Sequence, residues 1–324
     1  MSKITNNAGC VRIPKNEKIN VVAIVGPTAC GKTKTAIELA KLFDGEIVSA
    51  DSMQIYKGMD IGTAKPTASE TAEVAHHLVD FLDIDKEFSV SDYVKMAREC
   101  IIEIRNRGGL PFIVGGTGLY VNSLLDNINF ADQKPNPELR ESLVEKLKNE
   151  GANSLLAELA SFDREMAKKL YPNDTLRIIR AIEIYKTSGI TMTEHIKRSK
   201  KEESPYNPVI LGLSYRNRKI LYDQINKRVD KMIDAGLIDE ARRFLASNCG
   251  KTAMNAICYK ELAPYINGQC ELGVAVENLK QQTRRYAKRQ LTWFKRDARV
   301  DWIFIDDYLS FKEMLQVCVR TIKF

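Results

Sequence analysis

Short apolar runs alternate with segments of helical spacing along the first third of the chain. Val21 to Val25 and Leu110 to Val114 are apolar runs followed by glycine, and Glu46 to Ala50 forms a third run. Helical spacing begins at about Lys32, and again after Ser91, which we predict to be an N-cap. Because strands buried on both faces are continuously apolar, this alternation predicts a parallel sheet covered by helices on both sides.

The pattern changes after about Tyr120. Asn136 and Pro137 are residue types of an N-cap and a first helical position, and from there to about Ser199 the spacing is helical with no convincing strand. Two later runs, Val209 to Ser214 and Trp302 to Ile305, are typical of strands that return to the sheet, and long helical segments lie between them at roughly Lys219 to Ala235 and Val274 to Arg296. We predict a flexible polar tail (1–20), an α/β core (21–120 and 205–324) and a helical insertion domain (121–204) that ends in a charged linker (197–203).

Composition and charge exclude several classes of protein. The chain has 324 residues, 44% of them hydrophobic and 28% charged, as in ordinary globular proteins and unlike disordered or fibrous ones. It contains no run of about eighteen apolar residues and no signal-like N-terminal segment, so we expect a cytoplasmic protein without a membrane-spanning helix. Seven cysteines without a Cys-x-x-Cys pair indicate neither disulfides nor a zinc site. The net charge of +7 is compatible with a polyanionic partner without requiring one.

A segment between the first predicted strand and the first predicted helix matches the phosphate-loop pattern G-x-x-x-x-G-K-[ST]. It consists of Gly26, Pro27, Thr28, Ala29, Cys30, Gly31, Lys32 and Thr33. In such a loop, backbone N–H groups and the helix N-terminus surround phosphate oxygens, and Lys32 adds a full positive charge. The Thr33 hydroxyl is placed to bind a Mg²⁺ ion shared with the phosphates. The alternative, a chance match in a turn, is disfavoured by the strand before the motif and the helix after it.

The loop indicates a polyphosphate ligand, and ATP is only one of the molecules that fit. A nucleoside-triphosphate hydrolase also needs an acidic residue at the end of an apolar strand to hold Mg²⁺. Neither Leu110 to Val114 nor Val209 to Leu213 is followed by one. Asp51 does follow the run from Glu46 to Ala50, but it begins a motif of another kind.

The sixteen residues from Asp51 to Pro66 (DSMQIYKGMDIGTAKP) closely resemble the signature of tRNA dimethylallyltransferases. Further blocks agree in the same order: the phosphate loop, His76 to Asp80, Gly115 to Tyr120, Asp174 to Tyr185 and Thr283 to Asp297. The resemblance extends from about Val21 to Ile305 and implies a phosphate-loop α/β fold. One departure is Cys258, which stands where the family usually has glycine. Lacking the zinc-finger tail of the eukaryotic relatives, the chain resembles the bacterial form.

These enzymes attach a dimethylallyl (isopentenyl) group to N6 of the adenosine at position 37 of tRNA, next to the anticodon, and release diphosphate. The resemblance implies that Asp51 is the base for the N6 proton, and that Thr117 contacts the bridging oxygen of the diphosphate and the adenosine. It also implies that Ser52, Met53 and Gln54 contact the tRNA together with Asp51 and Thr117. From the residues alone, a turn or N-cap role for Asp51 and an N-cap role for Thr117 stay open.

Further tRNA contacts are implied at Arg140, Leu176, Arg177, Ile178, Ile179 and Arg180. Arg177 and Arg180 are one helical turn apart, and we expect their helix at the edge of the core, facing the insertion. The helix from Gln281 onward has aromatic residues between its many cations, so Arg285 and Arg289 are predicted to follow an RNA backbone. A solvated helix face is the alternative interpretation of both arginine sets.

We therefore expect a monomeric, Mg²⁺-dependent prenyltransferase that uses dimethylallyl diphosphate, acts on the anticodon stem-loop of tRNA and has no membrane partner. A phosphate-loop kinase of small molecules would explain residues 26–33 but neither the block from Asp51 to Pro66 nor the basic helix. A non-catalytic RNA-binding protein would leave the phosphate loop without a role. A prenyltransferase of free adenine nucleotides is a closer alternative, which the large insertion disfavours. His76 and His77 are more typical of structural residues, and we assign them no role.

Overall fold

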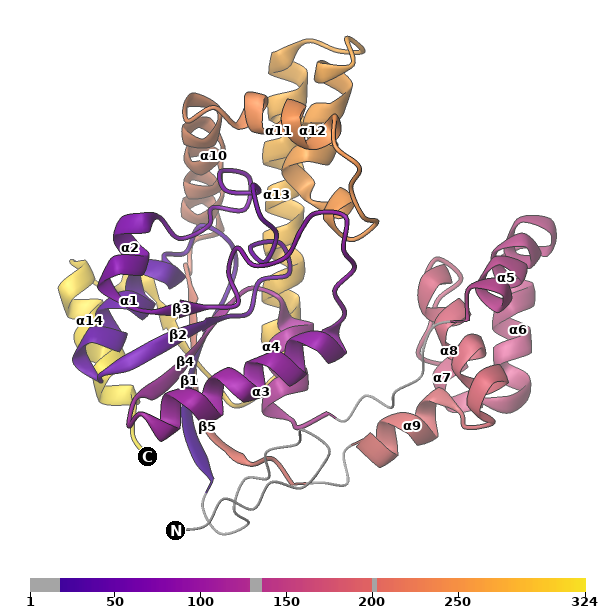
Figure 1. The fold of residues 1–324 in the computed structure, drawn as a ribbon, viewed down its shortest axis with the longest axis horizontal. Helices are drawn as coiled ribbons and strands as arrows, with labels where there is room; N and C mark the ends of the chain where they lie inside the picture. Colours follow the sequence, from indigo (N-terminus) through magenta and orange to yellow (C-terminus); the bar gives the residue numbers. More distant parts are fainter. Residues whose placement is uncertain (1–17, 129–135, 200–202) are drawn as a thin grey trace. The chain divides into compact units, whose positions relative to one another are not determined.

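The computed structural model describes residues 18–128, 136–199 and 203–324 (Figure 1). The chain divides into two compact units, one formed by residues 1–125 and 204–324 and the other by residues 126–203. We call the described residues of the first the core unit and those of the second the insertion. Each has a hydrophobic core of its own. In the part of the chain that the structure describes, no helix is long and apolar enough to cross a membrane.

The core unit is built on one sheet of six parallel strands. In chain order they are β1 (Ile19–Val25), β2 (Gly45–Ser49), β3 (His76–His77), β4 (Leu110–Gly115), β5 (Tyr206–Ser214) and β6 (Val300–Phe304). Their order across the sheet is β3-β2-β4-β1-β5-β6, so β1 and β4 are central, and both are almost wholly buried. The predicted parallel α/β sheet is confirmed, while the short edge strand β3 has no counterpart in the sequence prediction.

Helices cover both faces of this sheet (Figure 1). α1 (Lys32–Leu42) and α14 (Phe311–Thr321) pack on one face, in a core that includes Ile24, Leu39 and Met314. α3 (Val90–Asn106) and α4 (Gly118–Leu125) cover the other face, where the rings of Tyr93 and Tyr120 stack. The core unit also contains α2 (Ala68–Glu73) and two single 3-10 turns, Ala253–Asn255 and Ile305–Asp307.

The start of α3 corrects the sequence prediction. Its N-cap is Ser89 rather than Ser91. Ser89 Oγ accepts from the N–H of Asp92, and the Asp92 carboxylate accepts from the N–H of Ser89 at 2.9 Å. Of the two serines, only Ser89 has an acidic residue three positions later, and this capping box decides where the helix begins.

Four further helices of the core unit pack together at the top of Figure 1. They are α10 (Arg218–Asp234), α11 (Leu237–Leu245), α12 (Ile257–Ile266) and α13 (Leu272–Phe294). Their shared apolar core includes Leu237, Tyr259 and Leu279, and it also contains Ile55 and Tyr56 from the segment after β2. This packing ties the segment after β2 to helices that lie much later in the chain.

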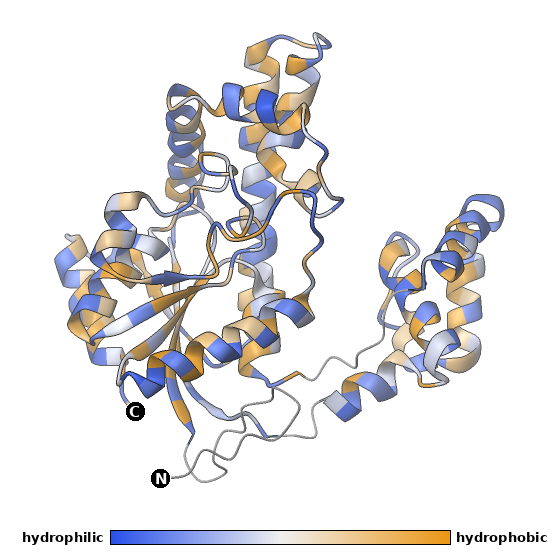
Figure 2. Ribbon diagram, viewed as in Figure 1, coloured by the Kyte–Doolittle hydropathy of each residue, from blue (hydrophilic) through white to orange (hydrophobic). Residues whose placement is uncertain are grey.

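The insertion is a set of helices around a small apolar core. Its helices are α5 (Pro137–Glu150), α6 (Ala152–Phe162), α7 (Arg164–Ala167), α8 (Thr175–Ser188) and α9 (Met192–Ser199). As predicted, Asn136 caps α5, accepting from the N–H of Leu139 at 3.1 Å, and Pro137 is the first residue of the helix. Apolar and polar residues alternate along these helices (Figure 2), and Leu143, Leu155 and Ile182 are among those buried between them.

The insertion corrects two predictions about its second half. α8, which carries Arg177 and Arg180, belongs to the insertion itself and not to the edge of the core, because its apolar face packs with α5 and α6. α9 continues to Ser199, so the first residues of the predicted linker are helical, and Lys197 pairs with Glu165 at 3.0 Å. The rest of that linker at 200–202, and residues 1–17 of the predicted tail, lie outside the described residues.

Candidate active site

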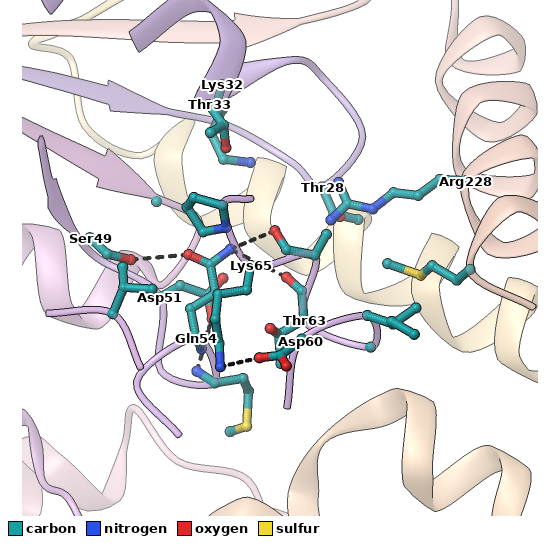
Figure 3. Close-up of a pocket in the computed structure, with 18 of the residues that line it drawn as sticks. Thr28, Lys32, Thr33, Ser49, Asp51, Gln54, Asp60, Thr63, Lys65 and Arg228 are labelled. Atoms are coloured by element: carbon teal, nitrogen blue, oxygen red, sulfur yellow. Dashed lines mark hydrogen bonds and ion pairs between the residues drawn. The ribbon is translucent and has the colours of Figure 1, made fainter. Parts of the chain in front are cut away.

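A cavity of about 1120 Å³ opens in the core unit at the carboxyl ends of the central strands (Figure 3). Its wall includes the phosphate loop after β1, the residues after β2, and Gly115 at the end of β4. α10 and α13 contribute Arg228, Thr283, Tyr286 and Gln290. Open parallel sheets bind ligands in the crevice at the carboxyl ends of their strands, so the topology and the cavity indicate the same place.

The phosphate loop leads into α1 with the first turn of that helix uncapped. Gly31 occupies the N-cap position, and no side chain among the described residues caps the helix. The first N–H groups of α1 are therefore left for a ligand, and the helix dipole favours an anion there. Cys30 fills space beneath the loop, where burial raises the pKa of its thiol and Sγ donates to the carbonyl of Pro27 at 2.9 Å. The loop residues that line the cavity are Thr28, Ala29, Gly31, Lys32 and Thr33.

Two cations face this cavity from different helices. Nζ of Lys32 donates to the carbonyl of Pro27 at 2.7 Å, and desolvation lowers the pKa of Lys32. Arg228 of α10 reaches toward the phosphate loop (Figure 3), and burial lowers the pKa of its guanidinium, which still stays charged at physiological pH. Holding two desolvated like charges together is costly, and an anion with several charges would offset that cost. Sequence reasoning missed Arg228, because it is one of many basic residues on an ordinary helix.

Asp51 lies at the carboxyl end of β2 with one oxygen engaged and one open. Oδ1 accepts from the N–H groups of Met53 at 2.9 Å and Gln54 at 3.3 Å. The carboxylate therefore shapes a turn, which was the structural alternative for Asp51. Among the described residues, none hydrogen-bonds Oδ2. A turn role and a base role are thus compatible on the two oxygens of one side chain.

Thr117 lies next to the Asp51 turn, because the segments after β2 and β4 are bonded to each other. Its N–H donates to the carbonyl of Ala50 at 3.1 Å, and its Oγ1 accepts from the N–H of Ser52 at 3.1 Å. The hydroxyl does not cap α4, since it is bonded to the neighbouring loop instead. The structure thus brings the two residues predicted to be catalytic to one place, although they are far apart in the sequence.

Gln54 is held by hydrogen bonds within its own part of the chain (Figure 3). Its Nε2 donates to the carbonyls of Thr63 at 3.2 Å and Ala64 at 3.1 Å, and its Oε1 accepts from Ser49 Oγ at 3.2 Å. Gln54 also lines the cavity. We call residues 51–66 the signature loop. The side chain of Gln54 joins the beginning of this loop to its later part, and its contact with tRNA stays a prediction.

A buried acid on α11 anchors the signature loop. Glu240, whose relative exposure is 3%, accepts from three consecutive N–H groups, those of Asp60 at 3.0 Å and of Ile61 and Gly62 at 2.8 Å. It also accepts from the hydroxyl of Tyr259 at 2.8 Å. Sequence reasoning missed it, although there was a signal: Glu240 is an acid on the face of α11 that buries Leu237, Ala241 and Phe244.

α13 contributes two polar residues that sequence reasoning also missed. Tyr286 lines the cavity, and burial, with the negative charge of Asp51 as a second cause, raises the pKa of its hydroxyl. The phenol therefore stays protonated and can donate a hydrogen bond. Gln290 lies one helical turn later and is buried. The sequence signal for both residues was weak, because they lie between the many cations for which this helix was predicted to bind RNA.

In the insertion, two of the predicted tRNA contacts converge on one acid. Arg140 and Arg180 donate to Glu183 Oε2 at 2.9 Å and 3.0 Å, and the side chain of Glu183 is 1% exposed. Burial tends to raise the pKa of Glu183, but the arginines and the N–H of Asn136 outweigh burial and lower it. Glu183 is thus a fixed anion that orients both guanidiniums, each of which remains partly exposed.

The segment from Leu176 to Arg180 is divided between surface and core. Leu176 is 79% exposed and Arg177 is exposed, whereas Ile178 and Ile179 are buried in the core of the insertion. Their side chains are therefore not available to RNA, which corrects that part of the prediction. A run of five residues covers more than one helical turn, so its side chains lie on different faces of the helix. Those of Ile178 and Ile179 lie on the buried face.

Two arginines of α13 and the two histidines of β3 complete the residues singled out in the sequence. Arg285 and Arg289 are exposed on α13, and the guanidinium of Arg289 lies 5.6 Å from the ring centre of Tyr286. His77 donates through Nε2 to the Glu46 carboxylate at 2.7 Å, and Glu46 also pairs with Arg107. His76 donates through Nδ1 to the carbonyl of Val74 at 2.8 Å. Both histidines thus have structural partners.

Comparison with known proteins points to one family. The family model described as IPP transferase matches residues 54–297, and the model described as Isopentenyl transferase matches residues 19–86. The tRNA dimethylallyltransferase of Thermoanaerobacter sp. (strain X514) is 48% identical over 305 residues, which cover 93% of this chain and 97% of that protein. The tRNA dimethylallyltransferase of Bacillus subtilis (strain 168) is 51% identical over 288 residues, or 89% of this chain and 91% of that protein.

Solved structures agree with the sequence comparison. The tRNA isopentenylpyrophosphate transferase of Bacillus halodurans is similar with a TM-score of 0.70 and 44% identity, over 94% of this chain and 95% of that one. A eukaryotic dimethylallyltransferase acting on tRNA is similar with a TM-score of 0.78 and 26% identity, over 92% of this chain and 77% of that one. The similarity thus extends over nearly the whole chain in both sequence and fold.

Proposed function

This chain belongs to the tRNA dimethylallyltransferase family and is a transferase, and we propose that it moves the dimethylallyl group of dimethylallyl diphosphate to N6 of the adenosine at position 37 of tRNA. The observation that carries the proposal is that an open phosphate loop and Asp51 line one cavity, with Thr117 bonded to Ser52, the residue next to Asp51. A diphosphate site and a proton acceptor side by side are what a displacement at an allylic carbon requires.

In this proposal the phosphate loop holds the leaving group. As the bond between the allylic carbon and the diphosphate oxygen breaks, its electron pair goes to the diphosphate, whose charge rises. The N–H groups at the start of α1, Lys32 and Arg228 are donors placed to stabilise that charge. Thr117 is proposed to contact the bridging oxygen. The phosphate loop of this fold thus serves to bind a departing group rather than to hydrolyse a nucleotide.

A Mg²⁺ ion fits this donor set. Within the described residues, no three His, Cys, Asp or Glu side chains form a metal cluster. Mg²⁺ often takes few protein ligands and completes its octahedral shell with substrate phosphates and water. Thr33 at the cavity wall is the residue that we propose to hold it. When bound, the ion would neutralise charge on the diphosphate.

Asp51 is proposed to accept the proton. The N6 amine attacks the allylic carbon, the new C–N bond forms, and N6 must lose a proton to regain neutrality. Asp51 Oδ2 is the open carboxylate oxygen at the cavity, while Oδ1 is fixed by two backbone N–H groups. A base held in one orientation needs little reorganisation at the moment of transfer.

RNA contacts are proposed on both the core unit and the insertion. We propose that Ser52, Met53 and Gln54 meet the anticodon loop, that Arg140, Leu176, Arg177 and Arg180 on the insertion contact the stem-loop, and that Arg285 and Arg289 follow its backbone. We place the protein in the cytoplasm as a monomer. A kinase or a prenyltransferase of free nucleotides is not favoured, since the relatives that cover nearly the whole chain act on tRNA by name.

The test is transfer by the purified protein in the absence of ATP. An anticodon stem-loop is incubated with dimethylallyl diphosphate and Mg²⁺, and the nucleosides are analysed by mass spectrometry. We expect isopentenyladenosine in the cognate loop, none when the target adenosine is replaced, and none from free AMP. Strict dependence on ATP, or transfer to AMP alone, would contradict the proposal.

A further inference from the structure

One face of α13 lies directly on the turn that carries Thr117. Gln290 and Trp293 are one turn apart on the helix, and each meets a glycine of that turn. A Cβ built on Gly116 would lie 2.0 Å from Nε2 of Gln290, and a Cβ on Gly118 would lie 2.2 Å from the Trp293 ring. Glycines on either side of Thr117 thus allow the close approach of α13. Trp293 Nε1 also donates to Asn122 Oδ1 at 2.9 Å, which fixes the helix on α4.

The amide of Gln290 joins this turn to the phosphate loop. Oε1 accepts from the N–H of Thr28 at 2.9 Å, and Nε2 donates to the carbonyl of Gly116 at 3.0 Å. Gln290 has a relative exposure of only 5%, so both bonds are shielded from water. One buried side chain thus spans the two segments that the reaction brings together, the segment for the diphosphate and the segment with Thr117.

The bridge needs a neutral group that accepts at one end and donates at the other, as the amide of Gln290 does. Thr28 offers a donor and Gly116 an acceptor, so the bridging group must accept at one end and donate at the other. A carboxylate would accept from Thr28 but would oppose the carbonyl of Gly116. An apolar side chain of the same length would leave both backbone groups unpaired in a buried place. This position therefore needs a side chain with one donor and one acceptor, and not merely one of the right volume.

We propose that Gln290 is a positioning residue that sets the separation between the phosphate loop and Thr117. Both ends of its amide are bonded to backbone groups, so it acts through these segments and not on the reacting atoms. It acts through Thr28, which shapes the loop that holds the leaving group, and through Gly116, which precedes Thr117. An error of about 1 Å between the leaving group and its partners can slow a reaction about a hundredfold. This inference rests on the proposed function, since it assigns Gln290 to the same diphosphate site.

Three variants separate the two hydrogen bonds from the volume of the side chain. Gln290→Met removes both bonds and keeps the length, Gln290→Glu keeps the acceptor and loses the donor, and Gln281→Met makes the same exchange at an exposed position of α13. We expect Gln290→Met to lower kcat about ten- to a hundredfold and to leave stem-loop affinity within about threefold. Gln281→Met should match the wild type in both.

The Glu variant gives a readout that a purely structural role would not produce. Its carboxyl group, once protonated, again donates to Gly116 and accepts from Thr28, so the activity relative to wild type should rise as the pH falls from 8.5 to 5.5. The titratable and charged groups around it are Tyr286 on α13, Lys32 and Cys30 of the phosphate loop, Asp51 after β2 and Arg228 on α10. The wild type has the same groups, so their titration cancels in the ratio of variant to wild-type activity. For Gln290→Met, which has no titratable group at this position, that ratio should not change with pH.

Inorganic pyrophosphate makes the test independent of turnover. Gln290→Met should weaken pyrophosphate binding about three- to tenfold, the worth of a hydrogen bond that shapes the loop, and Gln281→Met should not. If the wild type binds pyrophosphate but transfers nothing to RNA, the proposed function fails. The pyrophosphate affinities of Gln290→Met and Gln281→Met then still decide whether Gln290 positions the phosphate loop. A Met variant with wild-type kcat and pyrophosphate affinity, or a Glu ratio that does not rise on acidification, would overturn it. Thermal unfolding confirms that each variant is folded, and the Glu variant alone suffices if the Met variant is not.

Discussion

The phosphate loop and the signature loop line one cavity, yet they are held in place differently. Besides the long-range bond between Thr28 and Gln290, the phosphate loop is held by its own residues, with bonds such as those from Cys30 and Lys32 to Pro27. The signature loop is anchored by Glu240, a residue of α11 that is 178 positions away from Gly62. A short local pattern is therefore enough to recognise the first loop, whereas the geometry of the second depends on a distant part of the chain.

The largest effect is expected from removal of the anchor. In Glu240→Ala, three N–H groups and the Tyr259 hydroxyl lose their acceptor, and we expect a loss of about 3 kcal/mol in the free energy of unfolding, because buried donors are left unpaired. Denaturant titration measures it. Tyr259→Phe removes one of the four bonds and should cost about 1 kcal/mol, and Asp239→Ala, at the exposed neighbour, should cost less than about 0.5 kcal/mol. Equal effects of Glu240→Ala and Asp239→Ala would mean that the signature loop needs no anchor.

The next largest effect is expected at Asp51, which joins the two loops in function. Asp51→Asn keeps the shape of the side chain but cannot accept the N6 proton, so kcat should fall about a hundredfold or more. Affinity for the stem-loop should change only a few-fold. Asp44→Asn, at the opposite end of β2 and exposed, is the matched control and should behave as wild type. Near-normal turnover in Asp51→Asn would remove this residue from the mechanism.

A smaller effect is expected when the phosphate loop loses its cation. Lys32→Ala should weaken the binding of dimethylallyl diphosphate about tenfold and lower turnover, because the ammonium group is placed to stabilise the departing diphosphate. Isothermal titration with inorganic pyrophosphate measures the first part. Lys41→Ala makes the same exchange in the last turn of α1 and should leave the affinity unchanged. If both variants bind pyrophosphate like the wild type, the loop does not hold the leaving group.

The smallest effects are expected on the exposed face of α13. Charge-removing substitutions at Arg285 and Arg289 should each flatten the dependence of stem-loop affinity on salt by at most about one unit of slope and weaken every tRNA alike. Lys312→Gln, at an exposed position of α14, is the control. Unchanged slopes at Arg285 and Arg289 would show that this face is merely solvated.

The sequence predicted those parts of the molecule that local pattern determines. The apolar runs at β1, β2 and β4 predicted the sheet, and Asn136 with Pro137 predicted the start of α5, because the strand and cap signals lie within a few residues. The family resemblance added Asp51 and Thr117, which the fold brings together.

The missed and mistaken residues have tertiary causes. Arg228, Glu240 and Gln290 act on segments that precede them by up to 262 positions, so no local pattern links them to the site. The expectation that the helix of Arg177 and Arg180 lies at the edge of the core is wrong, because helical spacing shows which face is apolar but not what covers it. Ile178 and Ile179 were included with their exposed neighbours because a motif is continuous in sequence, whereas a helix surface is not.

The most direct test of the central claim compares tRNA from cells with and without this chain by nucleoside mass spectrometry. The account predicts that isopentenyladenosine, or a further-modified form of it, disappears from tRNA when the chain is absent. It should return with the wild-type chain but not with Asp51→Asn. An isopentenyladenosine signal that does not change when the chain is removed would contradict the account.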